Sequence, residues 1–78
     1  MTMSDTTRAM RLEVANMDTE QDLKRLQDAF AQEFVYDFKI SAEFDKKTVL
    51  IDGLWEDDLD VIDVVREAGF KITYALAM

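Results

Sequence analysis

The chain of 78 residues contains no cysteine and no histidine. Without thiols it can form neither a disulfide nor a thiolate metal site. It also lacks the histidine that most often acts as general base beside a nucleophile, and the thiol nucleophile of cysteine. Its two glycines are isolated, so no glycine-rich loop could hold a phosphate. We therefore expect a protein that is not an enzyme and that needs no cofactor.

Positive charge is also scarce, because nine Lys and Arg stand against 17 Asp and Glu, which gives a net charge of −8. A nucleic-acid-binding surface needs clustered Lys and Arg, so we expect no nucleic-acid partner. A charged protein partner should instead present a basic surface. Solubility alone would also explain an acidic composition in so small a protein.

Long hydrophobic runs are absent as well. No apolar stretch approaches the roughly 18 residues that cross a bilayer, and the opening residues MTMSDTTRAM lack the layout of a signal peptide. We expect a cytoplasmic protein with no membrane insertion. We also expect a flexible N-terminal segment over residues 1–8 and a single domain over residues 9–78.

The periodicity of apolar residues predicts the secondary structure, since alternation indicates strands and spacings of three and four indicate helices. In chain order, the pattern predicts a strand at 10–14, a helix of about four turns that includes 23–34, strands at 38–44 and 48–52, a helix at 58–68 and a strand at 72–76. This order predicts a ferredoxin-like α+β sandwich, in which two helices cover one face of a four-stranded antiparallel sheet.

Capping residues support both helices. Asp18 or Thr19 can cap the first helix, and Gln21 follows Asp18 at the spacing of a capping box. Asp57 can cap the second helix. Gly69 stands where a left-handed residue would end it.

The alternation also assigns side chains to the two faces of the sheet. The second helix should bury Val61, Ile62, Val65 and Ala68. On the open face of the sheet we expect a mixed surface that includes Leu50, Tyr36, Thr73 and Ala75. Such a surface favours a monomer or a weak homodimer.

Three stretches resemble the heavy-metal-associated domain family, which has the copper-chaperone-like fold. Met17 matches the buried methionine of the family's G-M-x-C-x-x-C loop, and EFDKKTVLI, residues 43–51, resembles its second hairpin. DVIDVVREAGF, residues 60–70, resembles its second helix and the Gly-aromatic pair that closes it. The resemblance implies the fold and a background in metal transport or metal homeostasis, such as interaction with a transport ATPase.

The chain departs from the family at the metal loop. The family's glycine is Asn16 here, and its two cysteines fall at Thr19 and Asp22. Hydroxyl and carboxylate oxygens do not replace thiolates as ligands of a soft ion. The chain therefore resembles a degenerate member without the C-x-x-C site. The resemblance further implies that Met17 supports the loop, and we expect Phe70 to pack against it.

Asp18, Thr19 and Asp22 nevertheless form an oxygen-rich helix start. Hard cations such as Mg²⁺ and Ca²⁺ prefer oxygen ligands, so these residues are candidate metal ligands. Capping of the helix explains the same residues without any metal.

An acidic run follows the only tryptophan. Trp55 and the carboxylates of Asp57, Asp60, Asp63 and Glu67 are candidate contacts for a basic partner. A solvated helix face explains the carboxylates equally well, and a core lid explains the tryptophan.

Three functions follow from these features. The first is a protein-docking domain without soft-metal ligands. The second is a domain that binds a metal ion through oxygen ligands at its first loop. The third is a small-molecule-binding regulatory domain of the amino-acid-binding type, which shares the same order of elements.

Overall fold

The computed structural model describes residues 8–34 and 38–77. Its elements, in chain order, are β1 (Arg8–Val14), α1 (Glu20–Glu33), β2 (Lys39–Glu43), the 3-10 turn η1 (Phe44–Lys46), β3 (Thr48–Gly53), α2 (Asp58–Glu67) and β4 (Ile72–Ala77). This is the β-α-β-β-α-β order that the periodicity predicts.

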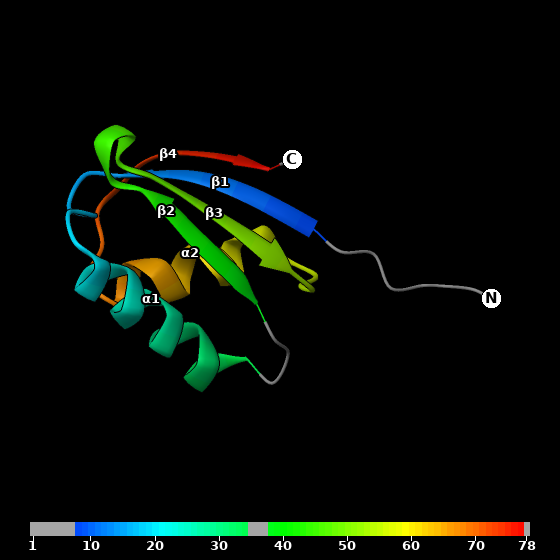
Figure 1. The fold of residues 1–78 in the computed structure, drawn as a ribbon. Helices are drawn as coiled ribbons and strands as arrows, with labels where there is room; N and C mark the ends of the chain where they lie inside the picture. The colour runs from blue at the N-terminus through cyan, green and yellow to red at the C-terminus, as the bar shows by residue number, and fades with distance from the viewer. Residues whose placement is uncertain (1–7, 35–37, 78) are drawn as a thin grey trace.

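The strands form one antiparallel sheet in the order β2-β3-β1-β4. Both helices lie on the same side of this sheet, and the opposite face of the sheet carries no helix (Figure 1). The predicted ferredoxin-like fold is therefore confirmed.

The core lies between the sheet and the two helices. In β1 every second side chain is buried, as the alternation predicts, and α1 contributes side chains four positions apart. The most deeply buried apolar side chains of these elements are Met10, Leu12, Val14, Leu26, Phe30, Val49, Ile51, Val61 and Val65.

The buried stripe of α2 differs in part from the prediction. Val61 and Val65 are buried as expected, but Val64 is buried as well. Ile62 and Ala68 are only half-buried. The helix therefore turns positions 61, 64 and 65 to the core, which is the i, i+3, i+4 pattern of a helix face.

The hairpin connection between β2 and β3 is one residue longer than predicted. The strand ends at Glu43, and Phe44–Lys46 form one 3-10 turn instead of continuing the alternation. Lys47 then takes a left-handed conformation with φ of 54°, and its N–H donates to the Phe44 carbonyl at 3.2 Å. A left-handed residue reverses the chain here, which a plain alternation of apolar residues does not reveal.

A β-bulge changes the faces of β4. Glu13 of β1 lies opposite Tyr74, whereas the next residue, Val14, lies opposite Ile72. Thr73 is thus the extra residue, and the alternation of β4 shifts by one position across it.

The bulge corrects our assignment of the open face. Residues directly opposite each other in a ladder share a face. Ala75 lies opposite the buried Leu12 and therefore faces the helices, whereas Leu76 lies opposite the exposed Arg11. Tyr74 and Leu76, which the unbroken pattern places inward, belong to the open face.

Two predictions fall partly outside the described residues. Strand β1 begins at Arg8, so Arg8 is part of the fold, and the predicted flexibility of residues 1–7 stays a prediction. Tyr36, expected on the open face, also lies outside the described residues. Among the residues that are described, no helix has the length and apolar character of a membrane span.

Candidate functional site

The loop between β1 and α1 lies at one end of the molecule, next to the η1 turn and to the connection between α2 and β4 (Figure 1). Backbone hydrogen bonds join the three segments. The N–H of Val14 donates to the Lys47 carbonyl at 2.7 Å, and the N–H of Ala15 donates to the Lys71 carbonyl at 2.9 Å. The loop is therefore fixed on both sides before its side chains are considered.

Asn16 strengthens one of these connections. Its Nδ2 donates to the Gly69 carbonyl at 3.0 Å, and its Oδ1 accepts from the N–H of Lys71 at 2.9 Å. The resemblance to the heavy-metal-associated family implies a glycine at this position. The Asn16 side chain links the loop to the end of α2 through two hydrogen bonds that a glycine could not make.

Met17 anchors the loop to the hydrophobic core. Its side chain is fully buried, and its N–H donates to the Val14 carbonyl at 3.3 Å. Phe70 is buried in the same core, and the guanidinium of Arg25 covers its ring at 4.6 Å from the centroid. Direct packing of Phe70 on Met17 stays a prediction.

Thr19 and Asp22, which occupy the cysteine positions of the family, form a capping box with each other. Thr19 is the N-cap of α1, and its Oγ1 accepts from the N–H of Asp22 at 3.3 Å. Asp22 Oδ2 accepts in return from the backbone N–H groups of Asp18 and Thr19, both at 3.1 Å. Of the two predicted N-caps, Thr19 and not Asp18 caps the helix. The residue whose side chain completes the capping box is Asp22, and not Gln21 as predicted.

The remaining acid of the loop is neutralised by a lysine. The Asp18 carboxylate forms an ion pair with Lys47 Nζ. Within residues 8–34 and 38–77, no group of three or more His, Cys, Asp or Glu side chains could hold a metal ion. The candidate oxygen ligands at Asp18, Thr19 and Asp22 are thus all engaged in contacts within the protein.

Trp55 covers one end of the core. It is only 8% exposed and stacks on Phe38, with ring centroids 5.8 Å apart and planes 9° apart. Its Nε1 donates to Asp58 Oδ1 at 2.7 Å, which satisfies the polar atom of the ring. Trp55 therefore offers little surface to a partner, and we do not retain it among the expected contact residues.

The acidic residues predicted on α2 have separate positions. Asp57 caps the helix, and its Oδ1 accepts from the N–H of Leu59 at 2.9 Å. Asp60, Asp63 and Glu67 are exposed and line hollows on the helix side of the molecule.

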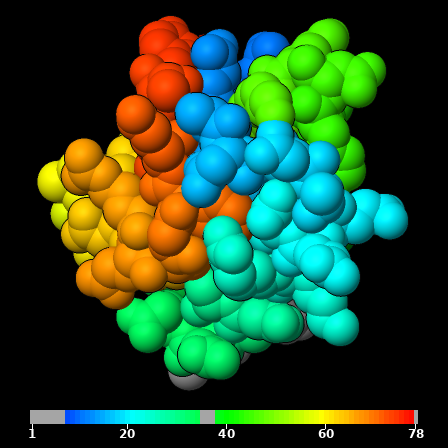
Figure 2. Space-filling model, turned by 90° about the vertical axis from the view of Figure 1, so that its left-hand side faces the viewer, coloured from blue at the N-terminus to red at the C-terminus, as the bar shows by residue number. Residues whose placement is uncertain are grey.

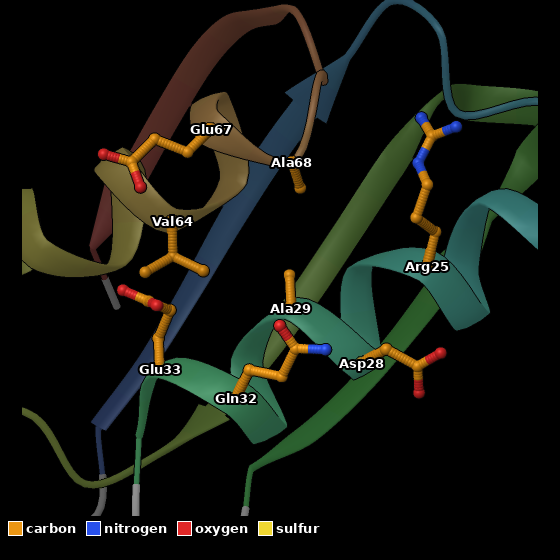
Figure 3. A pocket seen from close by; sticks show the side chains of 8 residues that line it. All are labelled: Arg25, Asp28, Ala29, Gln32, Glu33, Val64, Glu67 and Ala68. Atoms are coloured by element: carbon orange, nitrogen blue, oxygen red, sulfur yellow. The ribbon is translucent and has the colours of Figure 1, made fainter.

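These hollows form a groove between α1 and α2, which lie side by side on the face of the molecule shown in Figure 2. Its larger part has a volume of about 340 Å³, and a neighbouring part of about 200 Å³ shares three lining residues with it. The larger part is lined by Arg25, Asp28, Ala29, Gln32, Glu33, Val64, Glu67 and Ala68 (Figure 3). The neighbouring part adds Phe34, Asp60 and Asp63.

Small apolar residues form the centre of the groove. Ala29 of α1 faces Val64 of α2 and the C-cap residue Ala68 across the gap (Figure 3). Carboxylates surround this strip, and none of them takes part in an ion pair among the described residues. They are Asp28, Glu33, Asp60, Asp63 and Glu67. The single basic lining residue, Arg25, has its guanidinium over the Phe70 ring.

The sequence reasoning anticipated only the α2 side of this groove. It missed Asp28 and Glu33 of α1, although Ala68 was assigned to the apolar stripe of the second helix. Two alanines at facing positions leave a depression between helices. These small residues were the feature of the sequence that could have indicated the groove. The groove contains none of residues 16–22, so the structure does not join the loop and the acidic helix face into one site.

Comparisons with known proteins identify the fold. No protein-family model matches the chain, and no curated protein matches it. A similar solved structure is the solution structure of the N-terminal domain of ZntA in the apo-form, with a TM-score of 0.69. The match covers 94% of each chain at 14% sequence identity. The chain has a heavy-metal-associated-like fold. At this low identity the likeness concerns the fold alone.

Proposed function

We propose that this domain is a non-enzymatic docking module that binds a basic segment of a partner protein in the groove between α1 and α2. The observation that carries the proposal is the composition of the groove, in which an apolar strip is surrounded by five carboxylates. Lys and Arg side chains of a partner would meet these carboxylates, while its apolar side chains would cover Ala29 and Val64. The net charge of −8 would also speed the encounter with a basic partner.

The state of the β1–α1 loop supports docking over metal binding. Soft metals lack thiolates here, and the oxygen atoms of Thr19 and Asp22 already satisfy the first backbone N–H groups of α1. Lys47 supplies the positive charge next to Asp18. We infer that the loop has kept a structural role in a domain that no longer uses it for ions.

The biological setting that we propose is metal transport or metal homeostasis, for example contact with a transport ATPase. Two observations support it, namely the sequence resemblance to heavy-metal-associated domains and the likeness to the N-terminal domain of ZntA. The amino-acid-binding alternative would place a ligand where two paired sheets meet, so a side-by-side dimer would favour it. The groove lies elsewhere, on the helix side of the sheet.

A designed peptide tests the groove. The probe is an amphipathic helix of Lys and Leu, with Leu recurring at spacings of three and four, and binding is measured by isothermal titration calorimetry. We expect binding that weakens as salt screens the charges. The reversal Asp63→Lys together with Glu67→Lys should weaken it at least about tenfold, since truncation or reversal of close charges commonly costs more than about 1.4 kcal/mol.

A second double variant tests whether the change in net charge alone weakens binding. Asp45→Lys together with Glu43→Lys reverses two exposed carboxylates near the η1 turn and changes the net charge by the same amount. This control should bind the peptide nearly as well as the original protein does. Equal weakening by both double variants would show that the peptide responds to net charge, and it would overturn docking in the groove.

A further inference from the structure

The two edges of the sheet differ in a way that points to a second copy of this chain. Strand β2 forms one edge and has only five residues, two of which, Lys39 and Glu43, are charged. The carbonyl of Ile40 in its middle accepts a hydrogen bond from Gln27 Nε2 at 3.0 Å. Charges and short length are devices that prevent the pairing of sheet edges, and β2 has both.

Strand β4, with six residues, forms the other edge and lacks the charges that protect β2, and its bulge at Thr73 lies near the start of the strand. No charged residue occurs between Ile72 and Ala77, and within the described part of the chain β4 pairs only with β1. Tyr74 and Leu76 are 52% and 45% exposed on the open face. Backbone N–H and C=O groups on the free side of such a strand are available to a further strand.

We propose that two copies of the domain pair through β4, antiparallel and about a two-fold axis at Ala75. The two sheets would then join edge to edge into one continuous sheet. Antiparallel pairing centred on Ala75 places Tyr74 of one copy opposite Leu76 of the other, and the symmetry repeats the contact. Each pair covers two of the large exposed apolar side chains, and aromatic–aliphatic pairs of this kind stabilise antiparallel sheets.

The side chains of β4 favour a second copy over a foreign strand, because Tyr74 and Leu76 flank Ala75 and would pair with each other about a two-fold axis. The net charge of −8 opposes the approach of two copies, so they can meet only away from the main group of carboxylates. Strand β4 is such a place, because the acidic groove lies on the helix side of the sheet. On the open face, β1 presents Arg11 beside Leu76 and Glu13 beside Tyr74, one charge of each sign. The small side chains of Ala75 and Ala77 leave the helix side of the edge unobstructed.

Sedimentation equilibrium provides the first test. The original protein should shift from 9.0 kDa toward twice that mass as its concentration rises. Leu76→Lys should weaken the association at least about tenfold, a loss of about 1.4 kcal/mol. Leu59→Lys is the matched control, because Leu59 is 62% exposed and belongs to α2, not to β4. A protein that stays monomeric at about millimolar concentration, or equal effects of the two variants, would overturn the proposal.

Cross-linking provides a second test that does not depend on the stability of the lysine variants. The chain has no cysteine, so Ala75→Cys introduces a single thiol that can pair only with its copy. Opposed Cβ atoms in antiparallel pairs lie about 4.5–5.5 Å apart, close to the separation of a disulfide. Mild oxidation should yield a covalent dimer with Ala75→Cys and little with Leu59→Cys. Equal yields would contradict a two-fold axis at Ala75.

The dimer and the groove are tested independently. The lysine and cysteine variants of β4 alter the sheet edge, and the charge reversals of the docking experiment alter α2. Loss of peptide binding would therefore leave the dimer standing, and loss of the dimer would leave the groove standing.

Discussion

The ammonium of Lys47 lies against the carboxylate of Asp18 and joins the left-handed residue of the β2–β3 turn to the loop before α1. Both side chains are about half exposed, so the contact adds little to stability. Its main consequence is that the positive charge of Lys47 already balances the negative charge of the Asp18 carboxylate.

The first prediction concerns divalent ions. We expect the amide signals of Asp18 and Asp22 to stay unchanged in ¹H–¹⁵N NMR spectra when Zn²⁺ or Mg²⁺ is added, because their oxygens are engaged with Lys47 and with the N-terminus of α1. Cu(I) should also leave them unchanged, since no thiolate is present. Saturable, site-specific shifts with micromolar Zn²⁺ would instead support a metal site with oxygen ligands.

The second prediction concerns the capping box. Asp22→Ala removes the acceptor of the Asp18 and Thr19 N–H groups, and should lower the free energy of unfolding by about 0.5–2 kcal/mol. Gln21→Ala is the matched control, and it should change stability by less than about 0.5 kcal/mol. Urea denaturation measures both. A larger loss with Gln21→Ala would show that the reciprocal partner has been misassigned.

The third prediction concerns the role of Trp55. Trp55→Ala should destabilise the domain by about 3–5 kcal/mol, the range for truncating a large buried aromatic side chain. Leu59→Ala removes an exposed apolar side chain nearby and should cost less than about 0.5 kcal/mol. Because Trp55 is the only tryptophan, its fluorescence in the original protein should resist quenching by acrylamide. Easy quenching would contradict its role as a lid.

The fourth prediction concerns the close approach of Gly53 to an aromatic ring. A Cβ at this position would lie 2.6 Å from Phe38 Cδ2, and the Phe38 ring is stacked on Trp55. Gly53→Ala should therefore destabilise the domain by about 1–3 kcal/mol through overpacking. Combining it with Phe38→Leu should give less than the sum of the two single losses, because the smaller side chain relieves the clash. Strict additivity in thermal or urea denaturation would refute this cause.

Much of the fold could be predicted because the responsible signals are local. In β1 the alternation of Leu12 and Val14 with the polar Arg11 and Glu13 defines which face is buried. Asp57 and Gly69 mark the ends of α2 through their own backbone preferences, and the structure confirms both, with Gly69 at φ of +97°. Such signals depend on a few neighbouring residues and need no knowledge of the rest of the chain.

The errors arose where two local solutions were nearly equal or where a distant partner decided. Asp18 and Thr19 are both good N-caps, and in the structure Thr19 caps the helix while Asp18 pairs with Lys47. The faces of β4 depend on the bulge at Thr73, which is defined only by the pairing with β1. A slip of one residue reverses every side chain that follows, so the sequence pattern of β4 was misleading.

By itself, the sequence determined the order of the elements, most of the core, and the absence of thiolate ligands, because these follow from periodicity and residue type. Only the tertiary structure decided that Lys47 reaches Asp18, that Trp55 is buried, and that α1 and α2 enclose an acidic groove. These features join residues far apart in the chain, and their geometry depends on how helices and strands pack. The same packing leaves β4 as an uncharged edge, with Tyr74 and Leu76 turned to the open face.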